Sequence, residues 1–370
     1  MIRLTKPEVQ GAAEAIRSVL RDGYLVQGKL VKRFEDLVGA YVGRKQAVAV
    51  NSGTTAIQCA LEAFGIGEGD EVVVPDFTFP ATANAVVTCG ATPVLADIDL
   101  ETFNLSITSL EENLSPRTRA VMPVDLFGLA ADMKAIGDLA QARDILLIED
   151  SACALGSAFR AKKCGSFGRA SVISFHPRKI VTTGEGGMVL TDDQVVADRI
   201  RIERNHGIDV SDRKRGFVAA GSNFRMNEIE ACLGVAQMTD LENLIERRRS
   251  VARQYDRLLA DLGEVTPPIE PSGYFHTYQA YVVLVDSGID RDRLIAAMMA
   301  EGVETGIGTY AIHLQPYYSE RCAGGRKLPE ASHAFRHSLA LPLYPSMGEE
   351  VVAQVVSALK KCLPRSRTGT

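Results

Sequence analysis

The stretch Ser171-Val-Ile-Ser-Phe-His-Pro-Arg-Lys179, continued by Ile180-Val-Thr-Thr-Gly-Glu-Gly-Gly-Met-Val-Leu190, joins two short apolar runs through a polar, glycine-rich loop. The runs 171–175 and 187–190 are rich in β-branched and aliphatic residues, which is typical of strands. Gly184, Gly186 and Gly187 allow a tight turn and a close approach of the backbone to a ligand. The stretch therefore predicts two buried strands whose connecting loop can serve a binding site.

Comparable apolar runs precede this stretch, and longer helical patterns separate them. Alternating strands and helices are typical of an α/β sheet. Most of the runs are continuously apolar, as expected when helices cover both faces of the sheet. The predicted strands are Ala47–Val50, Glu71–Val74, Pro93–Ala96, Ala120–Val124, Ile145–Ile148, Ser171–Phe175 and Gly187–Leu190.

A second region begins after Asp240, where apolar residues at helical spacing predict a long amphipathic helix. We expect Arg247–Arg249 to lie on its solvated face rather than to bind nucleic acid. The proline-rich segment Thr266–Pro271 separates this helix from a predicted strand at Tyr278–Val285. We therefore predict a large domain over residues 1–245 and a smaller C-terminal domain over residues 246–370.

The composition is that of an ordinary globular protein, with 46% hydrophobic and 24% charged residues among 370. A net charge of -5 provides no field that favours nucleic acid or an anionic membrane. The first residues lack the apolar core of a signal peptide, and no apolar run approaches the about 20 residues needed to cross a bilayer. The 7 scattered cysteines form no CxxC pair, which indicates a reducing compartment and no structural zinc. We predict a cytoplasmic protein without a metal.

Residues Asn51-Ser-Gly-Thr-Thr55 follow the first predicted strand and open a predicted helix over 54–64. The free amides and positive end of a helix bind anions, and Gly53 lets the backbone come close to a phosphate. The alternative is simple N-capping of the helix by Ser52 or Thr54. From these residues alone the two interpretations are equally good.

Asp150 and Lys179 are candidates for cofactor chemistry because each follows a predicted buried strand. A carboxylate at such a strand end can hold a protonated pyridine nitrogen, although a strand-end aspartate more often caps a turn. A lone lysine is usually a solvated surface charge. To act as a nucleophile Lys179 needs a neutral amine, which burial and a neighbouring cation favour.

Phe77 and Phe79 also follow a predicted strand, in Pro75-Asp-Phe-Thr-Phe79. An aromatic ring here can stack on a planar cofactor, and core packing explains either residue equally well. The order of the features carries more information than any one of them: phosphate loop, aromatic residue, strand-end aspartate, Ser174, Lys179 and glycine-rich turn. Open α/β sheets bind their ligands in such loops at the carboxyl ends of the strands.

In this order the residues resemble the DegT/DnrJ/EryC1/StrS family of sugar aminotransferases, which have the type I fold of pyridoxal phosphate (PLP) enzymes. The resemblance implies an α/β fold whose large domain holds a mostly parallel seven-stranded sheet flanked by helices, beside a smaller α+β domain. The matching segments are Gly23–Gly28, Ser52–Thr54, Pro75–Phe79, Ala81–Ala85, Gly90–Pro93, Glu149–Asp150, Gly165–Gly168, Ser174–Phe175, Lys179, Gly184–Gly187, Arg204–Gly207, Gly221–Met226 and His313–Tyr317.

The resemblance also implies a role for each candidate that would contact the cofactor. Lys179 would form the Schiff base with PLP, Asp150 would pair with the pyridine nitrogen, and Phe79 would stack on the ring. The phosphate would be held by Gly53, Thr54 and Ser174.

Four further positions concern the partner subunit, the substrate and a departure from the family. The resemblance implies a homodimer in which Asn223 reaches the phosphate of the other subunit, so that the active site lies at the interface. His313 and Tyr317 would lie near the sugar. Where the family usually has a glutamine that contacts the 3′ oxygen of the cofactor, this chain has Cys153. A thiol is a poorer hydrogen-bonding group, and we expect Cys153 to be a small buried filler beside the cofactor rather than a nucleophile.

The implied reaction transfers an amino group from glutamate or glutamine to a keto-sugar by a ping-pong mechanism. The segment Ile307–His313 differs from the Tyr-Pro-x-Pro-Leu-His pattern associated with 3-amination, which favours a nucleotide-linked 4-keto-6-deoxysugar. A 3-keto-sugar, a keto-cyclitol or a keto-sugar acid are the alternative acceptors. A PLP sugar dehydratase is disfavoured because such relatives typically replace the lysine by histidine. A DNA-binding regulator would need an added helix-turn-helix domain and a basic face.

Overall fold

The computed structural model describes residues 1–209, 216–320 and 327–368. Its largest sheet has seven strands in the spatial order β1, β10, β9, β6, β5, β2 and β4. From β9 to β4 all neighbours are parallel, whereas β10 is antiparallel to both β1 and β9. The mostly parallel sheet and all seven predicted strands are therefore confirmed. Their bounds are β1 Gln46–Val50, β2 Glu71–Pro75, β4 Thr92–Ala96, β5 Thr118–Val121, β6 Leu146–Asp150, β9 Ala170–Ser174 and β10 Gly187–Thr191.

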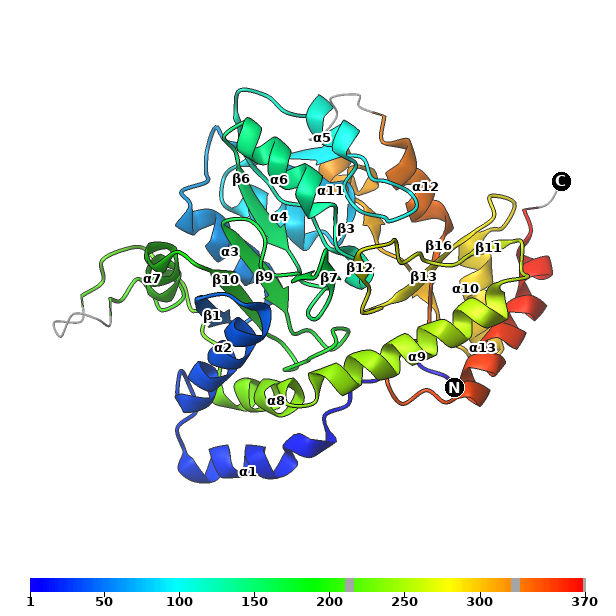
Figure 1. The fold of residues 1–370 in the computed structure, drawn as a ribbon, viewed down its shortest axis with the longest axis horizontal. Coiled ribbons are helices and arrows are strands. Elements are labelled where there is room, and N and C mark those ends of the chain that lie inside the picture. The colour runs from blue at the N-terminus through cyan, green and yellow to red at the C-terminus, as the bar shows by residue number, and fades with distance from the viewer. Residues whose placement is uncertain (210–215, 321–326, 369–370) are drawn as a thin grey trace.

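Helices cover both faces of this sheet (Figure 1). Successive residues of a strand point to opposite faces, so Val72 and Val74 of β2 enter one core while Val73 enters another. Helices α3, α4 and α7 contribute to the first core, and α2, α5, α6 and α8 cover the other face. Their bounds are α2 Lys29–Val42, α3 Gly53–Ala63, α4 Ala81–Thr88, α5 Ile107–Glu112, α6 Met133–Ala142, α7 Gln194–Glu203 and α8 Glu228–Met238.

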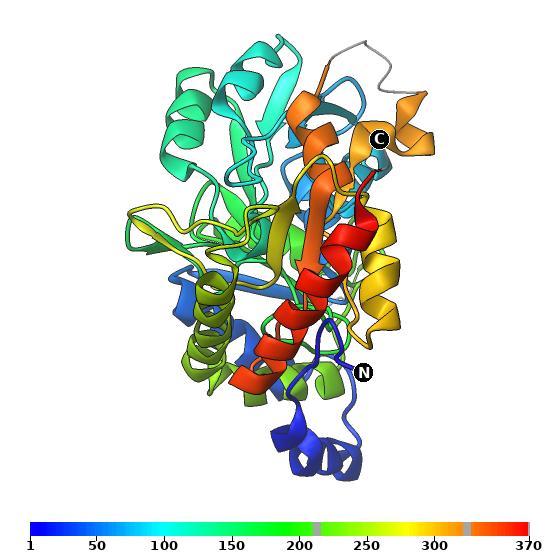
Figure 2. The ribbon, with the colours of Figure 1, turned by 90° about the vertical axis from the view of Figure 1, so that its right-hand side faces the viewer.

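The C-terminal part is built on a second, antiparallel sheet in the order β11, β13, β16 and β14. The long helix α9 connects it with the large sheet, and α10 and α13 lie side by side against it (Figures 1 and 2). This is the predicted smaller α+β unit. The bounds are α9 Leu241–Leu259, β11 Val265–Thr266, β13 Tyr281–Val285, α10 Arg291–Ala300, β14 Gly306–Ile307, β16 Ser338–Leu341 and α13 Glu349–Cys362.

Short elements connect the two parts. β3 pairs with β15, which brings the chain after residue 310 against the loop that follows β2. β12, β7 and β8 form a small sheet of their own. The bounds of these and the remaining elements are η1 Gln10–Ala12, α1 Ala13–Asp22, β3 Phe77–Thr78, η2 Leu126–Gly128, β7 Ala158–Phe159, β8 Lys162–Lys163, β12 Tyr274–Phe275, β15 Tyr310–Ala311, η3 Ile312–Leu314, α11 Pro316–Ser319, α12 Pro329–His337 and η4 Leu363–Ser366.

The prediction that Arg247–Arg249 lie on a solvated face of α9 is wrong. Arg248 is buried, and its guanidinium donates to the carbonyl oxygens of Tyr278 and Gln279 at 3.0 and 2.6 Å. Arg247 forms a two-pronged ion pair with Glu8 at 2.9 and 3.0 Å. The N-terminal segment and the chain before β13 cross this side of the helix, so the arginines bind peptide and carboxylate oxygens instead of water.

No helix in the described part of the chain combines the length and the apolar character that a membrane crossing requires.

Candidate active site

Four loops that carry the candidate residues leave the same edge of the large sheet. β1, β2, β6 and β9 run in the same direction, because β1 and β9 are both antiparallel to the strand between them. The loops after these strands begin at Asn51, Asp76, Ser151 and Phe175. The carboxyl edge of such a sheet is where open α/β folds bind ligands.

The loop after β1 and the end of β9 form a tight cradle. A Cβ atom on Gly53 would lie 2.8 Å from Cβ and 2.9 Å from Oγ of Ser174, so only glycine allows this approach. Ser52 caps α3, with its Oγ accepting from the Thr55 amide at 3.1 Å. The N-capping interpretation is thus confirmed for Ser52. It leaves the Gly53 and Thr54 amides in the first turn, where a helix offers no acceptor of its own. An anion placed here meets two amides and the hydroxyl of Ser174.

Asp150 ends β6 with its carboxylate buried inside the sheet edge. Its Oδ2 accepts from Thr82 Oγ1 at 2.9 Å, and its Oδ1 accepts from the Ala152 amide at 3.1 Å. Burial raises the pKa of Asp150, while these two hydrogen bonds and the charge of Lys179 oppose the rise. A cation bound beside this carboxylate would stabilise its ionised form further.

Lys179 is half-buried, and its charge acts on Asp150. Its amide donates to the His176 carbonyl at 2.8 Å, which closes a turn after β9. Its Nζ lies 2.9 Å from Sγ of Cys153. Cys153 is half-buried and contacts the candidate nucleophile, so the expectation of a small buried filler is wrong in its burial. This contact joins the loop after β6 to the loop after β9.

The two aromatic candidates have different environments. Phe77 is fully buried in the core beside Phe103 and Phe127, which confirms core packing for this residue. Phe79 is 62% exposed and makes an edge-to-face contact with Tyr310 at 6.4 Å between ring centroids. Its outward position leaves a ring face free for a planar ligand, and stacking by Phe79 stays a prediction.

His313 is held against the loop after β2. Its Nδ1 lies 2.6 Å from Oδ2 of the fully buried Asp76, and its amide donates to Oδ1 of the same carboxylate at 2.8 Å. Its Nε2 lies 3.2 Å from Oγ of Ser332. Tyr317, in the next short helix α11, is 46% exposed. The imidazole therefore has a fixed orientation at the rim of the site.

Asn223 is exposed beside the loop after β1, where its carbonyl accepts from Asn51 Nδ2 at 3.4 Å. Its side chain is exposed at the surface.

Two residues that position the site were missed by sequence reasoning. Thr82 binds Asp150, and Asp76 orients His313. Each belongs to a segment that matches the family, Asp76 to Pro75–Phe79 and Thr82 to Ala81–Ala85. The available signal was that Asp76 directly follows a strand and that Thr82 lies in the first turn of a helix. Nothing in the sequence says which strand end each one faces.

Comparison with known proteins agrees with this geometry. The model of the DegT/DnrJ/EryC1/StrS aminotransferase family matches residues 8–360. GDP-perosamine synthase of Caulobacter vibrioides is 40% identical over 91% of each chain. The structure of DesV from S. venezuelae is 32% identical and superposes with a TM-score of 0.90 over 97% of this chain and 98% of that one. The PLP form of the putative sugar aminotransferase Spr1654 from Streptococcus pneumoniae is 25% identical, with a TM-score of 0.93 over 98% of each chain.

Proposed function

Because the chain belongs to the DegT/DnrJ/EryC1/StrS aminotransferase family and is a PLP-dependent sugar aminotransferase, we propose that it aminates a nucleotide-linked 4-keto-6-deoxysugar with glutamate or glutamine as donor. The observation that carries the assignment of the site is the convergence of Lys179, Asp150 and the Gly53–Ser174 cradle at one sheet edge.

The described residues fit the cofactor. The cradle that a Cβ on Gly53 would fill suits its phosphate, and the buried carboxylate of Asp150 suits a protonated pyridine nitrogen. When bound, PLP supplies an aldehyde that carries the amino group and a ring that accepts an electron pair. Gly53, Thr54 and Ser174 would bind the phosphate, Phe79 would cover the ring, and Lys179 would hold the cofactor covalently through Nζ.

Lys179 is also the group that we propose moves the proton during transfer. An amine freed from the cofactor can take a proton from one carbon and return it to another, as a general base and then a general acid. Cys153 Sγ, at 2.9 Å, gives Nζ a fixed hydrogen-bonding neighbour. Asp150 would keep the pyridine nitrogen protonated, because the hydrogen bonds from Thr82 and the Ala152 amide favour its ionised carboxylate.

The acceptor would lie against the segment that contains His313 and Tyr317. Asp76 holds the His313 imidazole in one orientation, in which it can form a hydrogen bond with a sugar hydroxyl. Two observations favour the proposed acceptor. The segment Ile307–His313 lacks the pattern associated with 3-amination, and a relative with 40% identity is named for a GDP-linked product.

We propose a homodimer whose active sites lie at the interface, with Asn223 reaching the phosphate bound by the second copy. Exposed apolar side chains support an interface on this side of the molecule, including Tyr24 and Phe217 at 61% and 75% exposure. Their segments lie next to the one that carries Asn223, because Val26 pairs with Asn227 and Asn205 pairs with Asn223. We also propose the cytoplasm as the location, as the scattered cysteines suggest.

The test is a panel of keto-sugars incubated with the purified enzyme and glutamate or glutamine. The panel holds 4-keto and 3-keto nucleotide sugars, a keto-cyclitol and a free keto-sugar acid, and NMR assigns the aminated carbon. We expect turnover of a 4-keto-6-deoxysugar nucleotide and amination at C4. Preferred turnover of any other member identifies the corresponding alternative and contradicts the proposal.

A further inference from the structure

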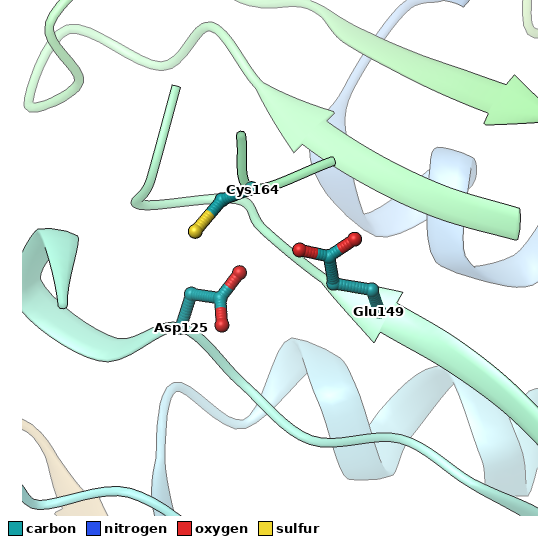
Figure 3. Close-up of side chains that lie close together, drawn as sticks. All are labelled: Asp125, Glu149 and Cys164. Atoms are coloured by element: carbon teal, nitrogen blue, oxygen red, sulfur yellow. The ribbon is translucent and has the colours of Figure 1, made fainter. Parts of the chain in front are cut away.

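Three buried side chains lie close together at the end of β6 (Figure 3). They are Asp125, Glu149 and Cys164, all fully buried, and their ligand-type atoms lie within 4.8 Å of one another. Glu149 immediately precedes Asp150, and successive strand residues point to opposite faces. The cluster therefore lies beneath the residue that we propose binds the pyridine nitrogen.

Oxygens of the two carboxyl groups lie within 4.8 Å of each other, and a hydrogen bond between them would require a proton. Glu149 also accepts from the amides of Gly165 and Phe167 at 2.7 and 2.8 Å. Asp125 accepts from the Ala131 amide at 2.9 Å and from Ser151 Oγ at 2.7 Å. In the described part of the chain neither carboxyl group pairs with a lysine, arginine or histidine. Two uncompensated negative charges in this environment would be costly, and one shared proton removes that cost.

A proton explains the cluster better than a metal ion. Each carboxylate oxygen already accepts one hydrogen bond from the protein, so half of the lone pairs that could bind a metal are used. Burial and the two neighbouring carboxyl groups raise the pKa of the Cys164 thiol well above its usual range, and a metal would need the thiolate. We place the proton on Asp125. Burial raises the pKa of both carboxyl groups, and the charge of Glu149 raises that of Asp125 further, whereas Glu149 accepts from two amides that favour its ionised form.

We propose that Asp125 is protonated in the folded enzyme, donates its carboxyl hydrogen to Glu149, and so acts as a positioning residue for Asp150. The backbone makes the connection. The Asp125 amide donates to the Asp150 carbonyl at 3.0 Å, and the Asp150 amide donates to the Pro123 carbonyl at 2.9 Å. The bond from Ser151 to Asp125 fixes the residue on the other side of Asp150. This inference rests on the proposed role of Asp150.

Loss of the proton would place two negative charges in the cluster. Among the described residues, the Cys164 thiol and, further out, the Tyr274 phenol also interact with Asp125, and neither supplies a positive charge. Asp150 lies on the opposite face of the strand. Because the folded state holds this proton more tightly than the unfolded chain does, its contribution to stability is lost as the pH rises through the pKa of the folded pair.

The test compares Asp125→Asn with Asp125→Leu. Asparagine keeps a neutral donor to Glu149 and an acceptor for Ser151, whereas leucine leaves the Glu149 charge without its partner. Infrared spectroscopy of the cofactor-free protein should show a protonated-carboxyl band in the wild type that Asp125→Asn removes. PLP titration by absorbance should give Asp125→Asn an affinity within about threefold of wild type and Asp125→Leu at least a tenfold loss. The control Asp97→Asn, at a buried aspartate that caps α12, should keep the band and the affinity.

Urea unfolding of the cofactor-free protein provides a second measurement that does not need Asp125→Leu to fold. As the pH rises above 3.8, the ordinary pKa of an aspartate, wild type should lose more stability than Asp125→Asn. A carboxyl band that survives Asp125→Asn, an unchanged pH dependence, or a stoichiometric metal removed by Asp125→Asn would overturn the shared proton. Equal, strong loss of PLP binding in both variants would overturn the positioning role. Failure of wild type itself to bind PLP would instead contradict the proposed function.

Discussion

At the scale of single residues, the site depends on contacts that link distant parts of the sequence. From its sequence neighbours alone, Lys179 cannot be distinguished from a surface lysine. Its assignment as the Schiff-base lysine depends on the order of motifs along the chain. The structure adds that its Nζ meets Cys153 and that its charge acts on Asp150. These contacts join the loops after β6 and β9, and no sequence pattern specifies how deeply each side chain enters the space between them.

Lys179→Ala should abolish transamination by a factor of at least about 10³, because the variant loses both the covalent attachment and the proton carrier. It should still bind PLP through the phosphate cradle and Asp150. Activity assays and absorbance titration measure the two effects. Borohydride reduction of the wild type followed by peptide mapping should find the cofactor on Lys179. The exposed Lys162→Ala serves as control and should remain active. An adduct on another lysine would refute the assignment.

Thr82→Val should weaken PLP binding roughly tenfold, because a hydrogen bond to a charged group contributes about 1.5 kcal/mol or more. The hydroxyl lies 2.9 Å from Oδ2 of Asp150 and favours the ionised carboxylate. Valine keeps the shape and removes the donor. Thr78→Val is the matched control, since Thr78 contacts Thr82 rather than Asp150. Equal affinities of the two variants would show that the bond to Asp150 contributes nothing to cofactor binding.

At the scale of elements, sequence patterns predicted the apolar strands of the large sheet. They failed for elements and side chains whose environment is set by tertiary contacts. All seven strands of the large sheet were predictable because their runs are buried on both faces. The two-residue strands β3 and β15 were not, since a pair this short has no detectable period, yet their pairing brings His313 to Asp76. The arginines of α9 were misjudged because charge predicts a solvated face, whereas here peptide carbonyls and Glu8 replace water.

The packing of α7 against α3 makes stability depend on pH. Burial raises the pKa of Glu203, at the end of α7, to about 7, the charge of Glu62 adds to the rise and Arg199 opposes it. In the unfolded chain the carboxyl has its ordinary value of 4.5. The folded state therefore binds the proton more tightly. The resulting stabilisation is complete below pH 4.5 and is lost as the pH rises through about 7.

Glu203→Gln should flatten this part of the stability profile, because glutamine cannot ionise. Urea unfolding between pH 5 and pH 8 measures the free energy of unfolding, and wild type should lose more of it across that range than the variant. Glu111→Gln, at an exposed position in α5, should keep the wild-type slope. A Glu203→Gln slope equal to that of wild type would mean that Glu203 is ionised throughout.

At the scale of the whole molecule, the N-terminal segment packs against residues from the second half of the chain. The Ile2 amide donates to the Gly302 carbonyl at 2.8 Å, the Leu4 amide donates to Glu304 at 3.0 Å, and Glu8 pairs with Arg247. The predicted domain boundary after residue 245 falls inside α9, which is continuous from Leu241 to Leu259. That boundary stays a prediction. Sequence patterns locate linkers by composition. They do not predict that the N-terminal segment packs against the C-terminal part of the fold.

The proposed interface site requires two copies of the whole molecule, because one catalytic centre would contain residues of both chains. Asn223→Asp should weaken PLP binding by placing a carboxylate beside the phosphate, and Lys179→Ala should be inactive. If Asn223 acts on the other subunit, mixing the two variants at a PLP concentration too low to load Asn223→Asp, and allowing subunits to exchange, restores one intact site in each mixed dimer. Equal mixing makes half of the dimers mixed, so about a quarter of wild-type activity should return. A mixture that stays inactive although native mass spectrometry detects mixed dimers would place Asn223 and Lys179 in the same subunit's site.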